Sequence, residues 1–334
     1  MAKIYAGWPY NLCQMGREAA AGTAVAATIV WRGPFGSPED DRNRNIAEES
    51  IGLIAPTTRT YDTWLGAKLA MPETELTTQQ VAHILEAGMM NATPGAGPAY
   101  LRTYLYSLTA TPNPIKTYTL ELGNQISTAD LKKLVYAYVE EFTLSGKNEE
   151  AWKMSASWRG QQMATLANFT AALSAPAVNE VMFANTLLYI DEPGGTIGTT
   201  QKLGVLMGAS IKVKTGIAYV PVGDGGLFYT AVKYTRPEVT YTLTLELEQD
   251  TGVSTVAAER AKFEAGTGRL IRLKNTDAAT RILQIDLSGK YTKIGGYDKQ
   301  GDGNTTVTFE GRCDYSATDA LFFTIALTNK LATL

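Results

Sequence analysis

The chain has 334 residues, of which 45% are hydrophobic and 19% are charged, a composition typical of a folded protein with a sizeable core. Its 30 basic and 33 acidic residues give a net charge of −3, so it lacks the basic surplus that tight binding to nucleic acid usually requires. Two cysteines at opposite ends of the chain and a single histidine argue against a disulfide scaffold and against a zinc site rich in cysteine or histidine.

The N-terminal region lacks the pattern of an export signal. Its mildly apolar stretch, residues 19–31, is interrupted by Gly22 and Thr23 and follows Arg17 and Glu18, which is unlike a signal peptide. No run of about 18 apolar residues predicts a membrane span. We therefore expect a protein that is made in the cytoplasm and does not insert into membranes.

Strict alternation of apolar and polar residues predicts β-strands in both halves of the chain. In the longest case, TYTLTLELE, tyrosine and leucine side chains face one way and threonine and glutamate face the other. The predicted strands are, in chain order, 117–122, 152–159, 240–248, 283–288 and 306–315. This pattern indicates a mostly β fold.

Only two segments carry helix signals. Thr77, followed three residues later by Gln80, matches a capping box, and Gly88 supplies a C-terminal stop. A second helix is predicted to begin near Ser254 and to end before Gly266. We expect one helix in each half of the chain.

Adjacent glutamates interrupt one apolar stretch. On a regular strand Glu140 and Glu141 point to opposite faces, so they would not act as paired acids at one site. Glu140 would then share the face of Phe142 and Leu144, which predicts a β-bulge or a polar interface at this point.

Short matches in the same order predict an internal repeat. Glu-Ala-Gly occurs at 86–88 and 264–266, and Leu-Ser-Gly-Lys occurs at 144–147 and 287–290. Each Leu-Ser-Gly-Lys precedes an alternating segment, which predicts a hairpin at that point in both halves. The unequal spacings place a longer insert in the first half, so we predict a first domain at 1–177, with an insert at about 89–130, and a second domain at 178–334.

No constellation of residues indicates catalysis. His83 lies inside the first predicted helix beside its apolar face, where a buried structural role is expected rather than a triad. The glycine-rich segment 194–200 lacks the Gly-Lys-Ser/Thr ending of a phosphate loop, and Asp298, Asp302 and Asn304 lack EF-hand spacing. We predict that the protein is not an enzyme and has no catalytic, cofactor or metal site.

Five segments follow one another in an order that resembles a known family. They include YVEEFTLSGK at 138–147 and LQIDLSGKYTKI at 283–294, together with 16–33, 52–88 and 194–202. In this succession they are similar to the tandem-domain major tail tube proteins of long-tailed, siphovirus-like phages. The segment from about 89 to 126 matches that family poorly.

The resemblance implies a fold and a task. Each of the two domains would be a β-sandwich with a flanking helix, and one sheet of each would join its neighbours in a closed β-barrel ring. Trimers would form pseudo-hexameric rings that stack around a tape measure protein into the tail tube. The tube would meet tail terminator and distal tail or tip proteins, would conduct phage DNA, and would be assembled in the host cytoplasm as part of the virion.

A conduit should let DNA pass without holding it, so its lining should be neutral or weakly acidic. We hypothesise that the polar faces of predicted strands contribute to this lumen. The candidate lumen-facing residues are Glu141, Thr143, Thr244, Glu246, Gln284 and Asp286.

Two alternative functions stay open. One is a tube protein of a contractile or secretion apparatus, in which a single domain would be more usual. The other is an extracellular β-sandwich binding or adhesin module, for which Trp8, Trp31 and Trp64 would supply an aromatic strip. If rings stack, we expect the contacts between them to come from residues up to about 45, from 89–126 and from 191–202.

Overall fold

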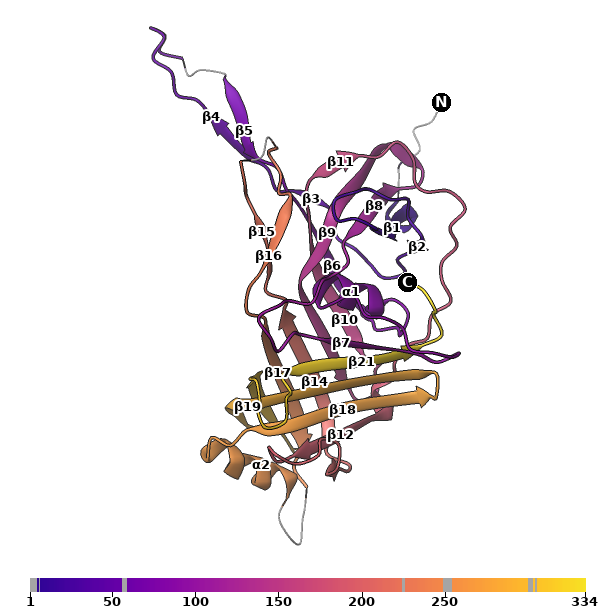
Figure 1. The fold of residues 1–334 in the computed structure, drawn as a ribbon, viewed down its shortest axis with the longest axis vertical. Helices are drawn as coiled ribbons and strands as arrows, with labels where there is room; N and C mark the ends of the chain where they lie inside the picture. Colours follow the sequence, from indigo (N-terminus) through magenta and orange to yellow (C-terminus); the bar gives the residue numbers. More distant parts are fainter. Residues whose placement is uncertain are drawn as a thin grey trace.

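The computed structural model describes residues 5, 7–55, 59–223, 226–248, 254–299, 303 and 305–334, and it is mostly antiparallel β-sheet with two α-helices (Figure 1). In the first half the elements are β1 (Asn11–Arg17), β2 (Ile29–Val30), β3 (Glu39–Asp40), β4 (Asn43–Ile46), β5 (Thr60–Trp64), β6 (Ala67–Glu75), α1 (Val81–Gly88), β7 (Tyr100–Leu105), β8 (Tyr118–Asn124), β9 (Ser127–Lys147), β10 (Lys153–Gly160) and β11 (Met163–Thr165). In the second half they are β12 (Thr186–Asp191), β13 (Gln201–Lys202), β14 (Leu206–Lys214), β15 (Ile217–Val220), β16 (Ala231–Tyr234), β17 (Glu238–Glu246), α2 (Thr255–Glu264), β18 (Arg269–Ala278), β19 (Arg281–Lys299), β20 (Thr305–Cys313) and β21 (Phe323–Asn329). The mostly β prediction is confirmed.

Two long strands tie the layers of the molecule together. The first part of β9 pairs with β8 and β11, and its last part pairs with β10 and β14. Likewise, the first part of β19 pairs with β18 and β21, and its last part pairs with β20. The long sheet therefore runs β3–β6–β10–β9–β14–β17–β20–β19, and a second layer, β13–β12–β18–β19–β21–β7, crosses it in the lower half of the molecule (Figure 1).

The two halves pair their strands in the same pattern. Pairings β1–β2, β1–β8, β3–β6, β4–β5, β6–β10, β8–β9, β9–β10 and β9–β11 have counterparts β12–β13, β12–β18, β14–β17, β15–β16, β17–β20, β18–β19, β19–β20 and β19–β21. Two pairings have no counterpart and join the halves: β9 with β14, and β7 with β21. Strand β7 lies in the segment expected to be an insert, and it packs within the chain against the C-terminal strand.

The hairpin prediction at Leu-Ser-Gly-Lys is right in one half and wrong in the other. Residues 144–147 end β9, and the chain turns there into β10. Residues 287–290 instead lie inside β19, whose hairpin to β20 comes after Lys299. The two copies of the Leu-Ser-Gly-Lys sequence are therefore not structurally equivalent.

The predicted alternation holds along the strands that face the core. Tyr241, Leu243 and Leu245 of β17 are buried, as are Leu283, Ile285 and Leu287 of β19, Val307, Phe309 and Cys313 of β20, and Met154, Ala156 and Trp158 of β10. Leu247 and Tyr315, predicted to continue these faces, lie beyond the strand ends and are exposed. The buried side chains of the two crossing layers meet in one continuous core.

Both helices occur where they were expected. The Thr77 hydroxyl accepts a hydrogen bond from the Gln80 amide at 3.3 Å, and α1 begins one residue later. The Ser254 hydroxyl accepts one from the Ala257 amide at 3.1 Å and caps α2. Every residue of α1 is buried, whereas most of α2 is not. Neither helix of the described residues is long and apolar enough to cross a membrane.

Candidate functional site

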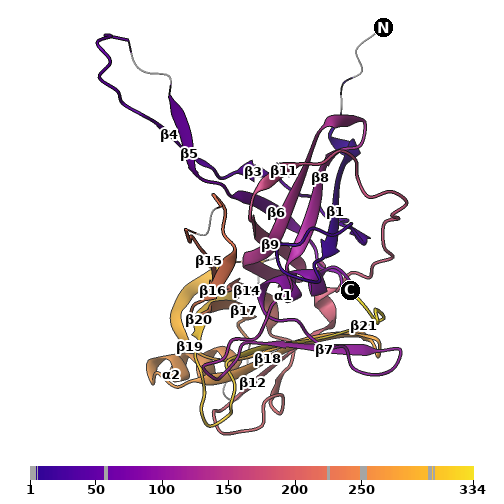
Figure 2. The same ribbon diagram turned by 45° about the horizontal axis from the view of Figure 1, so that its top comes forward.

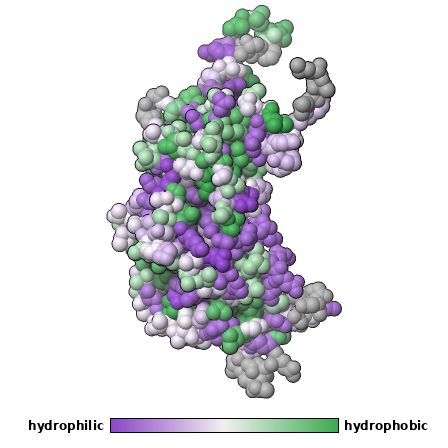
Figure 3. Space-filling view, turned by 90° about the vertical axis from the view of Figure 1, so that its right-hand side faces the viewer, coloured by the Kyte–Doolittle hydropathy of each residue, from purple (hydrophilic) through white to green (hydrophobic). Residues whose placement is uncertain are grey.

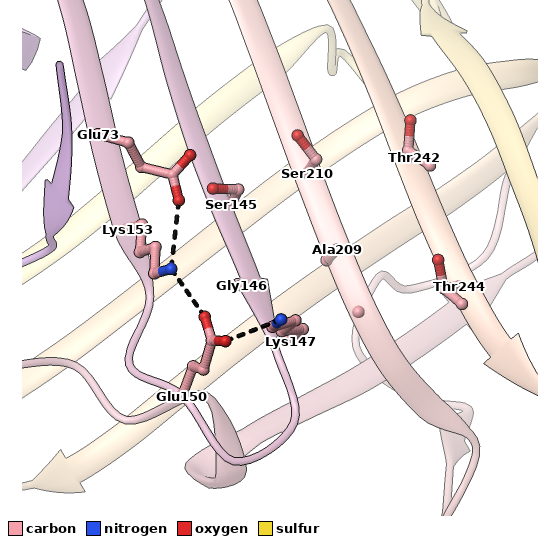
Figure 4. Close-up of a pocket in the computed structure, with 11 residues that line it drawn as sticks. Glu73, Ser145, Gly146, Lys147, Glu150, Lys153, Ala209, Ser210, Thr242 and Thr244 are labelled. Carbon is pink, nitrogen blue, oxygen red and sulfur yellow. Dashed lines mark ion pairs between the residues drawn. The ribbon is translucent and has the colours of Figure 1, made fainter. Parts of the chain in front are cut away.

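The long sheet carries a face of short polar side chains on the side away from the core. Adjacent strands β9, β14 and β17 present Ser145, Ser210, Thr242 and Thr244 in rows above a shallow recess (Figure 4). The other side of the same strands carries the buried apolar residues, because successive side chains of a strand alternate between faces. We call this side of the long sheet the polar face.

Several charges on the polar face are paired with one another. Glu150 contacts Lys147 and Lys153, both at 2.8 Å (Figure 4), and these lysines lower its pKa. Further pairs across neighbouring strands are Lys153–Glu73 at 3.5 Å, Lys212–Glu141 at 2.8 Å, Lys214–Glu238 at 3.1 Å and Lys293–Glu310 at 2.9 Å. These lysines are therefore compensated and do not form an uncompensated row for phosphate binding.

The structure brings together four of the six candidate lumen residues. Glu141 and Thr143 lie on β9, and Thr244 and Glu246 lie on β17, with β14 between the two strands. All four share the polar face.

Gln284 and Asp286 lie on a different surface. They belong to the first part of β19, which is in the crossing layer, and Asp286 pairs there with Arg272 at 2.7 Å. The core lies between this layer and the long sheet, so the outward sides of the two layers point away from each other. Gln284 and Asp286 therefore do not share the surface of the other four, because alternation identifies the two sides of a strand but not the layer to which it belongs.

The predicted bulge at Glu140 is confirmed. Ser157 pairs with Glu141 and Trp158 pairs with Val139, which leaves Glu140 as the extra residue. Its carboxylate accepts a hydrogen bond from the Arg159 guanidinium at 2.6 Å. The expectation that the two glutamates face apart was wrong, since both line one recess beside β14; the extra residue turns Glu140 outward.

The second half has the same bulge with different residues. Trp158 lies between Leu69 and Val139, and Phe309 correspondingly lies between Leu243 and Ile294. Two positions further along, Ala156 pairs with Phe142 and Val307 pairs with Tyr297. The four residues 139–142 thus correspond one by one to 294–297, with glycines at the bulge in place of glutamates.

The counterparts differ sharply in exposure. Phe142 is 1% exposed and Tyr297 is 66% exposed. Strand β14 runs beside Phe142 and pairs Val213 with it. Within the described residues the last part of β19 pairs with β20 on one side and has no strand on its other side, and the counterpart of β14 at the other end of the sheet is the two-residue strand β3. The long sheet therefore ends in two open edges and closes no barrel within one chain. Sequence patterns did not indicate these edges, because pairing between distant strands leaves no local signal.

The three tryptophans considered for an aromatic strip differ in their exposure. Trp31 is buried, Trp64 stacks on Tyr219 at 4.6 Å between ring centroids, and only Trp8 is largely exposed, so the three tryptophans form no exposed strip. Asp302 and Asn304 lie outside the described residues. Among the residues that are described, no group of three or more His, Cys, Asp or Glu is placed to hold a metal ion.

His83 is buried beside Tyr118 at the start of β8. Its Nδ1 lies 3.1 Å from the Tyr118 hydroxyl, and burial, together with the charges of Arg17 and Arg102, lowers its pKa to about 4. The hydrogen bond and the ring contact of this imidazole are both to Tyr118, so no catalytic nucleophile is paired with it among the described residues.

This burial predicts a pH dependence of stability. The unfolded chain binds a proton at this imidazole near pH 6.5, whereas the folded chain does so only near pH 4. Stability should therefore fall as pH falls across that window, by about 3 kcal/mol from this group. Urea unfolding of wild type and His83→Gln between pH 6.5 and 4 checks this: we expect the variant to lose less stability on acidification, and parallel curves would contradict the assignment.

No protein-family model matches the chain, and no curated protein matches its sequence.

Proposed function

We propose that this chain is a structural subunit that assembles with copies of itself, through the open edges of its long sheet, into rings that stack as the tail tube of a long-tailed phage. The single observation that carries the proposal is the joint between β9 and β14, because the counterpart edges, on β3 and on the last part of β19, have no second strand beside them among the described residues. A second copy supplying its β3 edge to the free part of β19 would repeat that joint.

The strand register of the β9–β14 pairing defines the register that we propose between β3 of one copy and β19 of the next. Asp40 pairs with Ala67 and Ile211 pairs with Tyr241, and Ala67 and Tyr241 occupy equivalent positions relative to Leu69 and Leu243. The β3 segment is therefore the counterpart of β14, and Asp40 would lie opposite Lys299 of the next copy. Opposite charges at this pair favour the contact.

Head-to-tail pairing repeats the same rotation at every joint, so it closes into a ring when the rotation divides a full turn. Closure also removes exposed strand edges, which otherwise promote indiscriminate aggregation. Two matching halves per chain give a pseudo-sixfold ring from three chains, as the resemblance to tail tube proteins implies. Rings would stack around a tape measure protein and end at terminator and tip proteins.

We assign the polar face to the lumen. Hydroxyls and compensated ion pairs offer DNA neither a basic track nor stacking surfaces. Glu141, Thr143, Thr244 and Glu246 are the lining residues of this proposal, and Gln284 and Asp286 fall outside it. The proposal includes no enzymatic step.

A pair of cysteines tests the joint directly. Lys214 pairs with Glu141 within the chain, and the counterparts of these two residues are Asn43 and Gly296. A Cβ added at Gly296 would meet no atom within 4 Å, and the native Cys13 and Cys313 are buried. Paired antiparallel residues lie at a Cα separation that a disulfide can bridge.

We expect oxidised Asn43→Cys/Gly296→Cys protein to form covalent closed oligomers, as seen by non-reducing electrophoresis and electron microscopy. Glu141→Cys/Lys214→Cys is the matched control, and it should form the bond within one chain. A double variant that stays monomeric at concentrations where wild type assembles would overturn the proposed joint. A wild-type protein that never associates, alone or with tape measure and tip proteins, would overturn the function.

A further inference from the structure

The β4–β5 hairpin projects from the body as an arm, defined here as residues 43–55 and 59–64 (Figures 1 and 2). Large apolar side chains on its described part are exposed: Ile46, Ile51, Leu53, Ile54 and Tyr61. Apolar side chains gather at the upper end of the molecule, where the arm ends (Figure 3). An exposed apolar cluster on a projecting segment marks a contact with another molecule.

The counterpart of the arm already has a seat within the chain. The β15–β16 hairpin lies against the first half, where Ile217 and Tyr229 are buried with Tyr136 and Tyr138 of β9. The Tyr229 hydroxyl donates to the Tyr136 carbonyl at 2.8 Å, and the Gln161 side-chain amide donates to the Tyr229 carbonyl at 2.6 Å. A hairpin leaving the long sheet at this point is thus held by the neighbouring half.

The register fixes which residues of the two hairpins correspond. Ile46 follows Asp40 at the same spacing as Ile217 follows Ile211. Their cross-strand partners, Thr60 and Tyr234, precede the equivalent residues Ala67 and Tyr241 at the same spacing. Ile46 is 67% exposed and Ile217 is 6% exposed. The residue that seals one hairpin against its neighbour therefore has an uncovered counterpart on the arm.

The arm and its predicted seat both carry charged residues where their counterparts in the chain carry uncharged ones. By the same register, Glu48 stands where Tyr219 stands in the other hairpin, and Lys293 and Arg312 stand where the first half has Tyr138 and Gln161. Tyrosine and glutamine at these positions of the seat within the chain are thus replaced by opposite charges on the two free surfaces. Lys293 is exposed on the polar face beside Glu310 and is available to a second carboxylate.

We infer that the arm is a clasp that seats on the second half of a neighbouring copy of this chain, burying Ile46 and placing Glu48 beside Lys293. This inference rests on the proposed assembly and adds a second contact to it. Pairing through the strand joint alone would leave the Ile46 side chain exposed to water, whereas seating of the arm buries it. The arm should therefore set the strength of association rather than the stability of the monomer.

The variants Ile46→Ser and Glu48→Lys test the clasp, with Thr63→Ser on the same arm as a control. Because Ile46 and Glu48 are exposed in the monomer, we expect unchanged thermal unfolding of the monomer. Association measured by analytical ultracentrifugation should weaken about tenfold or more for Ile46→Ser and about threefold to fivefold for Glu48→Lys.

A charge exchange supplies the stricter test. Lys293→Glu should weaken association as Glu48→Lys does, and the chain carrying both changes should regain most of the wild-type affinity. Wild-type association by Ile46→Ser, or no recovery in the double variant, would overturn the clasp. The Asn43→Cys/Gly296→Cys bond would still form in that case, so failure of the clasp is distinguishable from failure of the assembly itself.

Discussion

Replacing Phe142 by alanine should unfold the monomer readily, whereas the same change at its counterpart, Tyr297, should leave the monomer intact and abolish ring formation. Phe142 is enclosed by β10 and β14, so its removal leaves a cavity and should cost about 3–5 kcal/mol. Tyr297 is exposed, and its ring contacts only the Arg260 guanidinium, at 5.7 Å, among the aromatic and cation contacts of the described residues. Its burial is expected only in the assembly.

Two measurements on each variant separate these effects. Urea unfolding reports the free energy of the monomer, and light scattering of concentrated protein reports assembly. Equal destabilisation by Phe142→Ala and Tyr297→Ala would show that the two positions play the same role within one chain. Normal rings from Tyr297→Ala would show that the free edge of β19 is not used.

The second large effect is expected at the buried ion pair that holds α2 on the sheet. Glu259 is 0% exposed, and both its carboxylate oxygens accept hydrogen bonds from the Arg269 guanidinium at 2.8 Å. The Tyr291 hydroxyl donates to the same carboxylate at 2.9 Å. Replacing Glu259 by leucine leaves the buried Arg269 guanidinium with one ion-pair partner among the described residues, the more exposed Glu192. The change should cost about 3–5 kcal/mol of folding free energy.

A double-mutant cycle checks this reasoning. Because the cost comes from leaving one charge buried without its partner, Glu259→Leu/Arg269→Met should be more stable than Glu259→Leu alone. Free energies from urea unfolding of the four proteins give the coupling. Additive losses would mean that the residues stabilise α2 independently.

Local features of this fold were accessible from the sequence. Alternation located the core-facing side chains of β17 and β20, and the capping box at Thr77 located the start of α1. The position of Glu140 on an apolar face predicted a bulge. These features depend on neighbours in the sequence, whose geometry is set by the periods of strand and helix.

Features that depend on distant pairing were not accessible. The bend of β9, where Tyr136 adopts φ of 55°, and the corresponding change of layer along β19 decide which face each residue joins. For that reason Thr244 and Asp286 looked alike in sequence but lie on opposite sides of the core. The joint between β9 and β14 and the pairing of β7 with β21 likewise depend on contacts between the two halves.

A cryo-electron microscopy map of the assembled protein tests the central claim most directly. We predict rings in which a β3 segment from one copy lies beside residues 295–299 of the next, with Thr143 and Thr244 facing the lumen. A map in which the polar face lies on the outer wall, or in which no strand of another copy lies beside the last part of β19, would contradict the account.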